Sequence, residues 1–148
     1  MKLKIRQFPD PILLQPCKPV ESFDKRLHDI LDEMGILMKK AHGMGLAANQ
    51  LGISEQFFVM LSQRGDVVEF INPEFSDFDG NAGLPEGCLS LPNYYLTLKR
   101  SDSVIIKAQN RHGETFRVMV CGLEAVCAQH EYDHLQGIFY LQKEQPNG

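Results

Sequence analysis

Two stretches of the chain carry apolar residues at helical spacing. The first runs through Leu27, Ile30, Leu31, Met34, Leu37, Met38 and Ala41, which lie three, four and seven positions apart. This period predicts an amphipathic helix, which we expect to begin with Ser22 as its N-cap and to end at Gly43. A second helix is predicted from about Gly122 to Gln136, with Gly137 as its stop.

The middle of the chain has the short apolar runs that are typical of strands. Residues 56–61 and 67–71 flank a turn at 63–66, which predicts a hairpin. Further strands are expected at 94–99, 104–108 and 115–120, and residues 7–20 hold four prolines that indicate an extended segment. The order predicts an α+β fold, with antiparallel strands packed around a central C-terminal helix and one further long N-terminal helix.

Composition narrows the class of protein. The 148 residues are 43% hydrophobic and 23% charged, which predicts one globular domain over residues 1–148. We find no run of about 20 apolar residues and no secretory signal, so we expect no membrane span and a cytoplasmic location. Nineteen acidic and fifteen basic residues give a net charge of −4, which argues against nucleic-acid binding. The four cysteines are expected to stay reduced.

The strongest chemical signal lies on the second predicted helix, in His130-Glu131-Tyr132-Asp133-His134. Histidines at i and i+4 project from one face, so both imidazoles can reach a single metal ion. The histidines also extend an apolar stripe, which predicts a buried site. Glu131 is placed to take a proton from water beside the ion. Two core histidines spaced four apart by chance are the alternative.

Other residues are candidates for completing such a site. A catalytic metal centre needs a third protein ligand, and Cys88 in Glu86-Gly-Cys-Leu-Ser90 is the natural candidate, although it could be an inert thiol. Cys127 is a competitor on the helix itself, with core packing as its alternative role. The small residues of Gly43-Met-Gly-Leu-Ala-Ala-Asn-Gln50 allow a close backbone approach, and the Gln50 amide can steady an oxyanion.

These three blocks, in this order, resemble the motifs of the peptide deformylases, and the resemblance runs from about Phe8 to Tyr140. It implies metal ligation by Cys88, His130 and His134, with Fe²⁺ as the native ion and Zn²⁺ or Ni²⁺ as other occupants. It also implies that metal-bound hydroxide attacks the formyl group of a nascent N-formyl-methionyl peptide and releases formate. Glu131 would then be general base and acid, and the Gln50 amide and the Leu89 N–H would hold the oxyanion.

The resemblance also implies a substrate pocket of Met44, Leu84 and Val126, with Gly45 pairing with the peptide backbone. Two departures from the family pattern stand out. Tyr94-Tyr95 occupies a stretch where bacterial relatives often carry arginine, although Arg100 is near in sequence. The chain also lacks the C-terminal helical extension, so we expect a short form, a monomer whose contact with the ribosome is transient and does not use such a helix.

Two other functions would fit parts of the pattern. A metallopeptidase explains the helix but leaves Gln50 and Cys88 without roles, and a non-catalytic metal protein would need a fourth ligand. Asp133 fits either a hydrogen-bonding role behind the ligands or a plain surface position.

Overall fold

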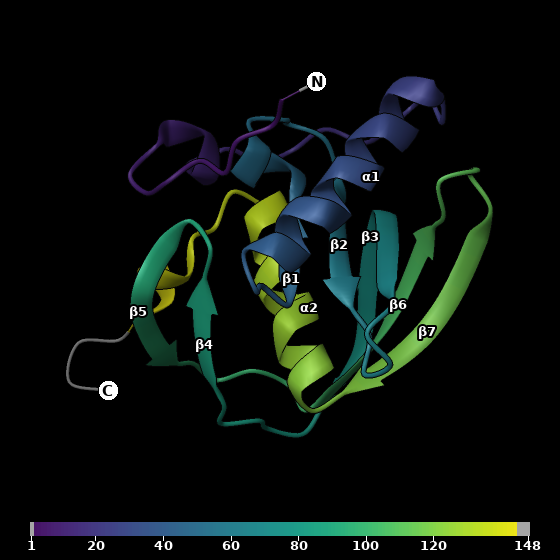
Figure 1. Ribbon diagram of the computed structural model, residues 1–148. Helices are drawn as coiled ribbons and strands as arrows, with labels where there is room; N and C mark the ends of the chain where they lie inside the picture. Colours follow the sequence, from purple (N-terminus) through teal and green to yellow (C-terminus); the bar gives the residue numbers. More distant parts are fainter. Residues whose placement is uncertain (1, 145–148) are drawn as a thin grey trace.

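The computed structural model describes residues 2–144 and has an α+β architecture. In chain order its elements are η1 (Pro11–Leu14), α1 (Lys25–Lys40), β1 (Gly45–Ala47), η2 (Ala48–Leu51), β2 (Phe57–Leu61), β3 (Val67–Asp79), β4 (Pro85–Cys88), β5 (Leu91–Thr97), β6 (Ser103–Gln109), β7 (Thr115–Cys121), α2 (Leu123–Leu135) and η3 (Tyr140–Lys143), where η marks a 3-10 turn. The strands form two antiparallel sheets, β1-β2-β3-β6-β7 and β4-β5. Helix α2 runs between them, and α1 lies across the larger sheet (Figure 1).

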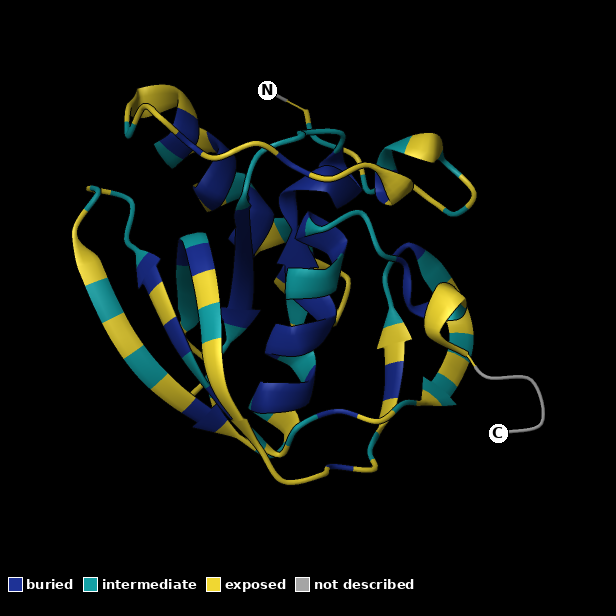
Figure 2. Ribbon diagram, turned by 180° about the vertical axis from the view of Figure 1, so that it is seen from behind, coloured by how far each residue is buried: buried dark blue, intermediate teal, exposed yellow. Residues whose placement is uncertain are grey.

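Both faces of strand β2 are covered by apolar side chains. Phe57 and Val59 belong to the apolar cluster around α1, whereas Phe58 and Met60 belong to the cluster around α2. Alternate side chains of a strand point to opposite faces, so this continuous apolar run serves two cores. Figure 2 shows the same burial along α2, which is dark blue over most of its length. The helix that carries the candidate ligands is therefore held on several sides.

The two ends of α1 differ from expectation by one or two residues. The N-cap is Asp24, whose side chain accepts the Leu27 N–H at 3.1 Å, and not Ser22. At the other end the residue in the left-handed region is His42, with φ of 58°, and not Gly43. Gly43 instead follows that residue and donates its N–H to the Met38 carbonyl at 2.9 Å. This bond completes a Schellman motif that lies one residue earlier than Gly43 in the left-handed position would place it.

The stop at the end of α2 is confirmed. Gly137 has a φ of 77° and donates to the His134 carbonyl at 3.0 Å, while Ile138 donates to the Asp133 carbonyl at 2.9 Å. A Cβ on Gly137 would lie 2.7 Å from the carbonyl carbon of Gln15. Glycine is therefore needed here both for the backbone conformation and for the approach of the N-terminal segment.

The predicted fold class and the longer strands are confirmed, and the short strands were missed. β1 and β4 have only three and four residues, which is too few for an alternating pattern. β3 runs eight residues beyond the predicted end at 71, and β5 begins at Leu91, three residues before the predicted start. Within residues 2–144 neither helix has the length and apolar character needed to cross a bilayer. Near the C-terminal end of the sequence, Tyr140–Lys143 forms η3, and residues 145–148 lie outside the described part.

The N-terminal segment joins the two sheets. The Arg6 N–H donates to the Gln50 carbonyl at 2.6 Å, and the Phe8 N–H donates to the Ser90 carbonyl at 2.8 Å. η2 follows β1 of the large sheet, and Ser90 lies in the turn between β4 and β5. Residues 6–8 therefore bridge the elements that lead into the site.

Candidate metal centre

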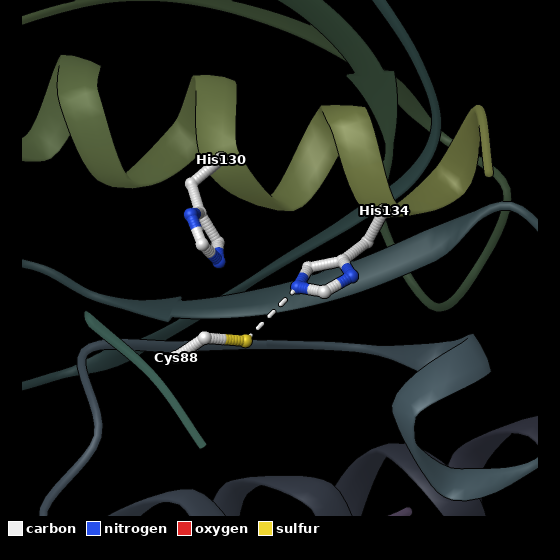
Figure 3. A group of neighbouring side chains, drawn as sticks. All are labelled: Cys88, His130 and His134. Carbon is white, nitrogen blue, oxygen red and sulfur yellow. Dashed lines mark hydrogen bonds between the residues drawn. The ribbon is translucent and has the colours of Figure 1, made fainter. Parts of the chain in front are cut away.

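Helix α2 presents two buried imidazoles one turn apart. His130 and His134 are 5% and 1% exposed, and their ring centroids lie 4.9 Å apart with the rings nearly perpendicular. Both side chains project toward Cys88, as Figure 3 shows. The helical spacing thus does what the sequence predicts: it directs two imidazoles to one point and removes both from water.

Cys88, at the end of β4, meets these rings from the opposite side. Its Sγ lies 3.3 Å from Nε2 of His134 (Figure 3). One donor atom from each of Cys88, His130 and His134 lies within 4.8 Å of the others. Nε2 of His130 is buried and has no hydrogen-bond partner in the described chain. A thiolate and two imidazoles are ligands that suit a divalent transition metal, so the residues present fit such an ion.

The two imidazoles differ in how readily they take up a proton. Burial would lower the pKa of His130, but contacts with Cys88 and Glu86 outweigh it and raise the pKa to about 10. The pKa of His134 is lowered well below its ordinary value, first by burial and then by the charges of His130 and Arg100. Near neutral pH His130 therefore carries a second proton and is cationic, whereas His134 is neutral. An ion that binds Nε2 of His130 must displace that proton.

A buried ion network lies behind His130. Nδ1 of His130 donates to Oε1 of Glu86 at 2.9 Å, and Glu86 in turn accepts two bonds from Arg100, at 2.7 and 3.1 Å. Arg100 also donates to Asp133 at 2.6 Å, and Lys143 lies 2.9 Å from the same Asp133 oxygen. This arrangement fixes which imidazole nitrogen carries the proton and leaves Nε2 for the ion.

The network shows what the sequence pattern missed. Glu86 stands two residues before Cys88 in the second motif, yet nothing in the local sequence assigned it to His130. Arg100 is turned inward and is 4% exposed, so it does not reach the cavity in place of the arginine that Tyr94-Tyr95 replaces. Of the two roles considered for Asp133, the hydrogen-bonding one is observed, because its side chain is only 13% exposed.

Glu131 lies on the cavity side of α2, against Gly45. It is 4% exposed, and its Oε1 has no partner in the described chain. A Cβ on Gly45 would lie 2.7 Å from Oε2 of Glu131 and 2.8 Å from Sγ of Cys127. Burial raises the pKa of Glu131 to about 7. A carboxyl group with this pKa can both take up and release a proton near neutral pH.

Gln50 and Leu89 flank Cys88 from two different loops. Oε1 of Gln50 accepts the Ala47 N–H at 2.9 Å, and its Nε2 donates to Oγ of Ser90 at 3.1 Å and to Sγ of Cys88 at 3.6 Å. The carbonyl side of the amide is therefore fixed, and its NH₂ group faces the thiol. Leu89 follows Cys88 directly and lines the same cavity.

The cavity has a volume of about 580 Å³. Of the predicted metal and catalytic residues its lining includes all but His134, which lies behind it: Gln50, Cys88, Leu89, His130 and Glu131. Met44, Gly45 and Val126 line it, as do Tyr94 and Tyr95. The remaining predicted pocket residue, Leu84, is half-buried just before β4 and is not among the lining residues. Cys127 lines the cavity beside Glu131 but is not part of the cluster of donor atoms.

An HExxH helix and a facing cysteine beside a cavity are the arrangement expected of a metal-dependent hydrolase. The sequence profile of the polypeptide deformylases matches residues 2–147. The peptide deformylase of Hahella chejuensis is 41% identical over 143 residues, which cover 95% of this chain and 85% of that protein. That of Caldicellulosiruptor bescii is 43% identical over 140 residues, with 95% and 84% covered. The chain belongs to the polypeptide deformylase family.

Solved structures agree with this assignment. The crystal structure of the peptide deformylase from Thermotoga maritima superposes with a TM-score of 0.93 at 38% identity, and covers 99% of both chains. That from Legionella pneumophila gives a TM-score of 0.94 at 37% identity, with 99% of this chain and 88% of that one covered. The protein is accordingly a metal-dependent hydrolase that removes the N-formyl group from nascent peptides. Neither a metallopeptidase nor a non-catalytic metal protein accounts for these matches.

Proposed function

We propose that Cys88, His130 and His134 hold one divalent ion, and that Glu131, Gln50 and Leu89 carry out the deformylation around it. The observation that carries this proposal is the convergence of three donor atoms within 4.8 Å, beside a cavity that Cys88 and His130 line. When bound, the ion supplies Lewis acidity that polarises a carbonyl oxygen and makes water more acidic.

Glu131 is the group that moves the proton. Its carboxyl lies one residue from His130 on the cavity side of the helix, and burial brings its pKa to about 7. It takes a proton from the attacking water and passes it to the nitrogen that leaves with the free amino terminus. The unpartnered Oε1 is the atom available for this exchange.

Gln50 and Leu89 stabilise the negative charge that develops on the formyl oxygen. The Gln50 amide is anchored through its own oxygen to the Ala47 N–H, so the position of its NH₂ group is fixed. Because the amide is neutral, it adds no charge to the site. The backbone N–H of Leu89 is the second donor. Donors that are fixed before the reaction need no reorganisation when the oxyanion forms.

Met44, Leu84 and Val126 are proposed to bind the methionine side chain, with Gly45 pairing with the peptide backbone. Apolar walls suit a flexible thioether. The absence of a Cβ at Gly45 leaves room for both the peptide and Glu131, whose Oε2 a methyl group would approach to 2.7 Å. Leu84 would contribute from the rim, since it stands outside the lining.

Fe²⁺ is proposed as the native ion, with Zn²⁺ and Ni²⁺ as alternative occupants. One thiolate and two neutral imidazoles leave a net charge of +1 on a divalent ion, which keeps it Lewis-acidic. We further propose that residues 1–148 form a single catalytic domain that acts as a monomer in the cytoplasm. Its contact with the ribosome would be transient. Sedimentation in the presence and absence of ribosomes tests both the monomer and the contact.

The decisive experiment measures formate release from formyl-Met-Ala-Ser. The protein is prepared without oxygen in its iron form, and separately with nickel and with zinc, and an unblocked peptide is offered in parallel. We expect formate from the formylated peptide and no cleavage of the unblocked one. Cleavage of the unblocked peptide, or no formate with any of the three ions, would refute the proposed function.

A further inference from the structure

The residue next to Gln50 makes a contact that the three motifs do not explain. Asn49 lies in η2 and is completely buried. Its Nδ2 donates to the backbone carbonyl of His134 at 2.6 Å. An amide removed from water must find its hydrogen-bond partners inside the protein. Here the partner of the Asn49 amide is the backbone of a candidate metal ligand.

The carbonyl that Asn49 contacts belongs to the last turn of α2, where carbonyl groups lack a partner within the helix. Other orphan carbonyls of this turn are satisfied by the backbone: Ile138 donates to Asp133, and Cys17 donates to Leu135, both at 2.9 Å. The His134 carbonyl accepts from the Gly137 N–H as well as from Asn49. The side chain of Asn49 is thus an additional cap on the helix, placed at the ligand itself.

Two complementary atoms remain without partners at this contact. Oδ1 of Asn49 and Nδ1 of His134 are both buried, and neither has a hydrogen-bond partner in the described chain. An imidazole that binds an ion through Nε2 carries its proton on Nδ1 and needs an acceptor for it. His130 has such an acceptor in Glu86. Asn49 is the buried acceptor that already touches His134.

We propose that Asn49 is a positioning residue for the metal site. Its Nδ2 holds the His134 carbonyl, and its unpartnered Oδ1 is the acceptor that the Nδ1–H of His134 would take when Nε2 binds an ion. Asn49 and Gln50 are consecutive in one 3-10 turn. The turn therefore ties the amide that receives the oxyanion to the helix that carries the ligand. This inference rests on the proposed roles of His134 and Gln50.

The test compares Asn49→Leu with wild type, because leucine fills a similar volume but can neither donate nor accept. Asn72→Ala is the matched control. Asn72 also bridges two segments through its amide, accepting the Val20 N–H at 2.8 Å and donating to the Val20 carbonyl at 3.0 Å. It lies on β3 and lines no part of the cavity. The control thus reports the effect of losing a bridging amide elsewhere in the fold.

The first readout is the rate at which the nickel-loaded protein releases its ion to a chelator, with the visible spectrum of the cobalt form recorded alongside. Loss of a group that supports a metal ligand typically costs 10- to 100-fold in metal affinity. We expect Asn49→Leu to release nickel at least about 10-fold faster than wild type and to shift the cobalt bands. We expect Asn72→Ala to match wild type in both. Equal release rates for the two variants would overturn the proposal.

The second readout is steady-state deformylation at saturating metal. Displacement of the Gln50 amide removes an interaction that acts in the transition state, so kcat should fall about 10-fold while KM stays within about 2-fold. A change confined to KM would contradict the link to Gln50. If Asn49→Leu does not fold, Asn49→Ala, which only removes atoms, is measured in the same way. Metal release needs no substrate, so inactive wild-type protein would refute the proposed function and not the role of Asn49.

Discussion

Replacing Arg100 by methionine should cost the protein a large part of its stability. The guanidinium is 3% exposed and makes three hydrogen bonds to Glu86 and Asp133. Removing one partner of a buried ionic network costs about 3–5 kcal/mol, because it leaves charges buried and uncompensated. We expect the lower end, about 3 kcal/mol, since Glu86 keeps His130 as a donor and Asp133 keeps Lys143. The melting temperature should fall by about 6–12 °C.

Lys143→Met is the matched control for this experiment. Lys143 contacts the same Asp133 oxygen as Arg100, at 2.9 Å, but its side chain is 40% exposed. An exposed pair of this kind contributes less than about 1 kcal/mol. Urea denaturation of the nickel-loaded proteins gives both free energies of unfolding. If the free energy of unfolding fell no more in Arg100→Met than in Lys143→Met, burial would not account for the contribution of Arg100 to stability.

Three further changes test the site. Glu131→Gln should bind metal with unchanged stoichiometry while kcat falls about 10²- to 10⁴-fold; full turnover in formate assays would remove Glu131 from the mechanism. Cys88→Ser should weaken metal binding far more than Cys127→Ser, as measured by metal content after dialysis, and equal losses would contradict the assigned ligand. Gly45→Ala should keep its circular dichroism spectrum but lose activity, because its methyl group would lie 2.7 Å from Oε2 of Glu131; a displacement of about 1 Å can cost about 100-fold in rate, and wild-type activity would show that the carboxyl moves aside freely.

The helices and long strands could be predicted because their signals are local. α1 and α2 follow from apolar spacing over three to four turns, and the hairpin of β2 and β3 follows from the turn between them. The errors at the ends of α1 have the same origin. Whether Asp24 or Ser22 caps the helix, and whether His42 or Gly43 takes the left-handed conformation, depends on how the flanking chain packs, and single residues carry too little information to decide it.

The groups behind the ligands could not be predicted in the same way. Glu86 meets Arg100 across 14 residues and His130 across 44, and Asn49 meets His134 across 85. No periodicity relates such positions, so their pairing appears only when the sheets and α2 are assembled. The three motifs identify the atoms that face the cavity, whereas the fold decides which buried groups hold those atoms in place.

The two sides of the cavity are built on different sheets, since Gly45 belongs to β1 and Cys88 to β4. Within residues 2–144 no strand of one sheet pairs with a strand of the other. The sheets are linked by the chain segments 80–84 and 98–102, which pair at Ala82 and Arg100, by α2, and by the crossing bonds of residues 6–8. The position of β4 relative to α2 is therefore set by these links and by the bonds of Glu86 to Arg100 and His130, and not by a shared ladder. Because Cys88 stands on the smaller sheet and the two histidines on α2, an ion held by all three would itself fasten that sheet to the helix.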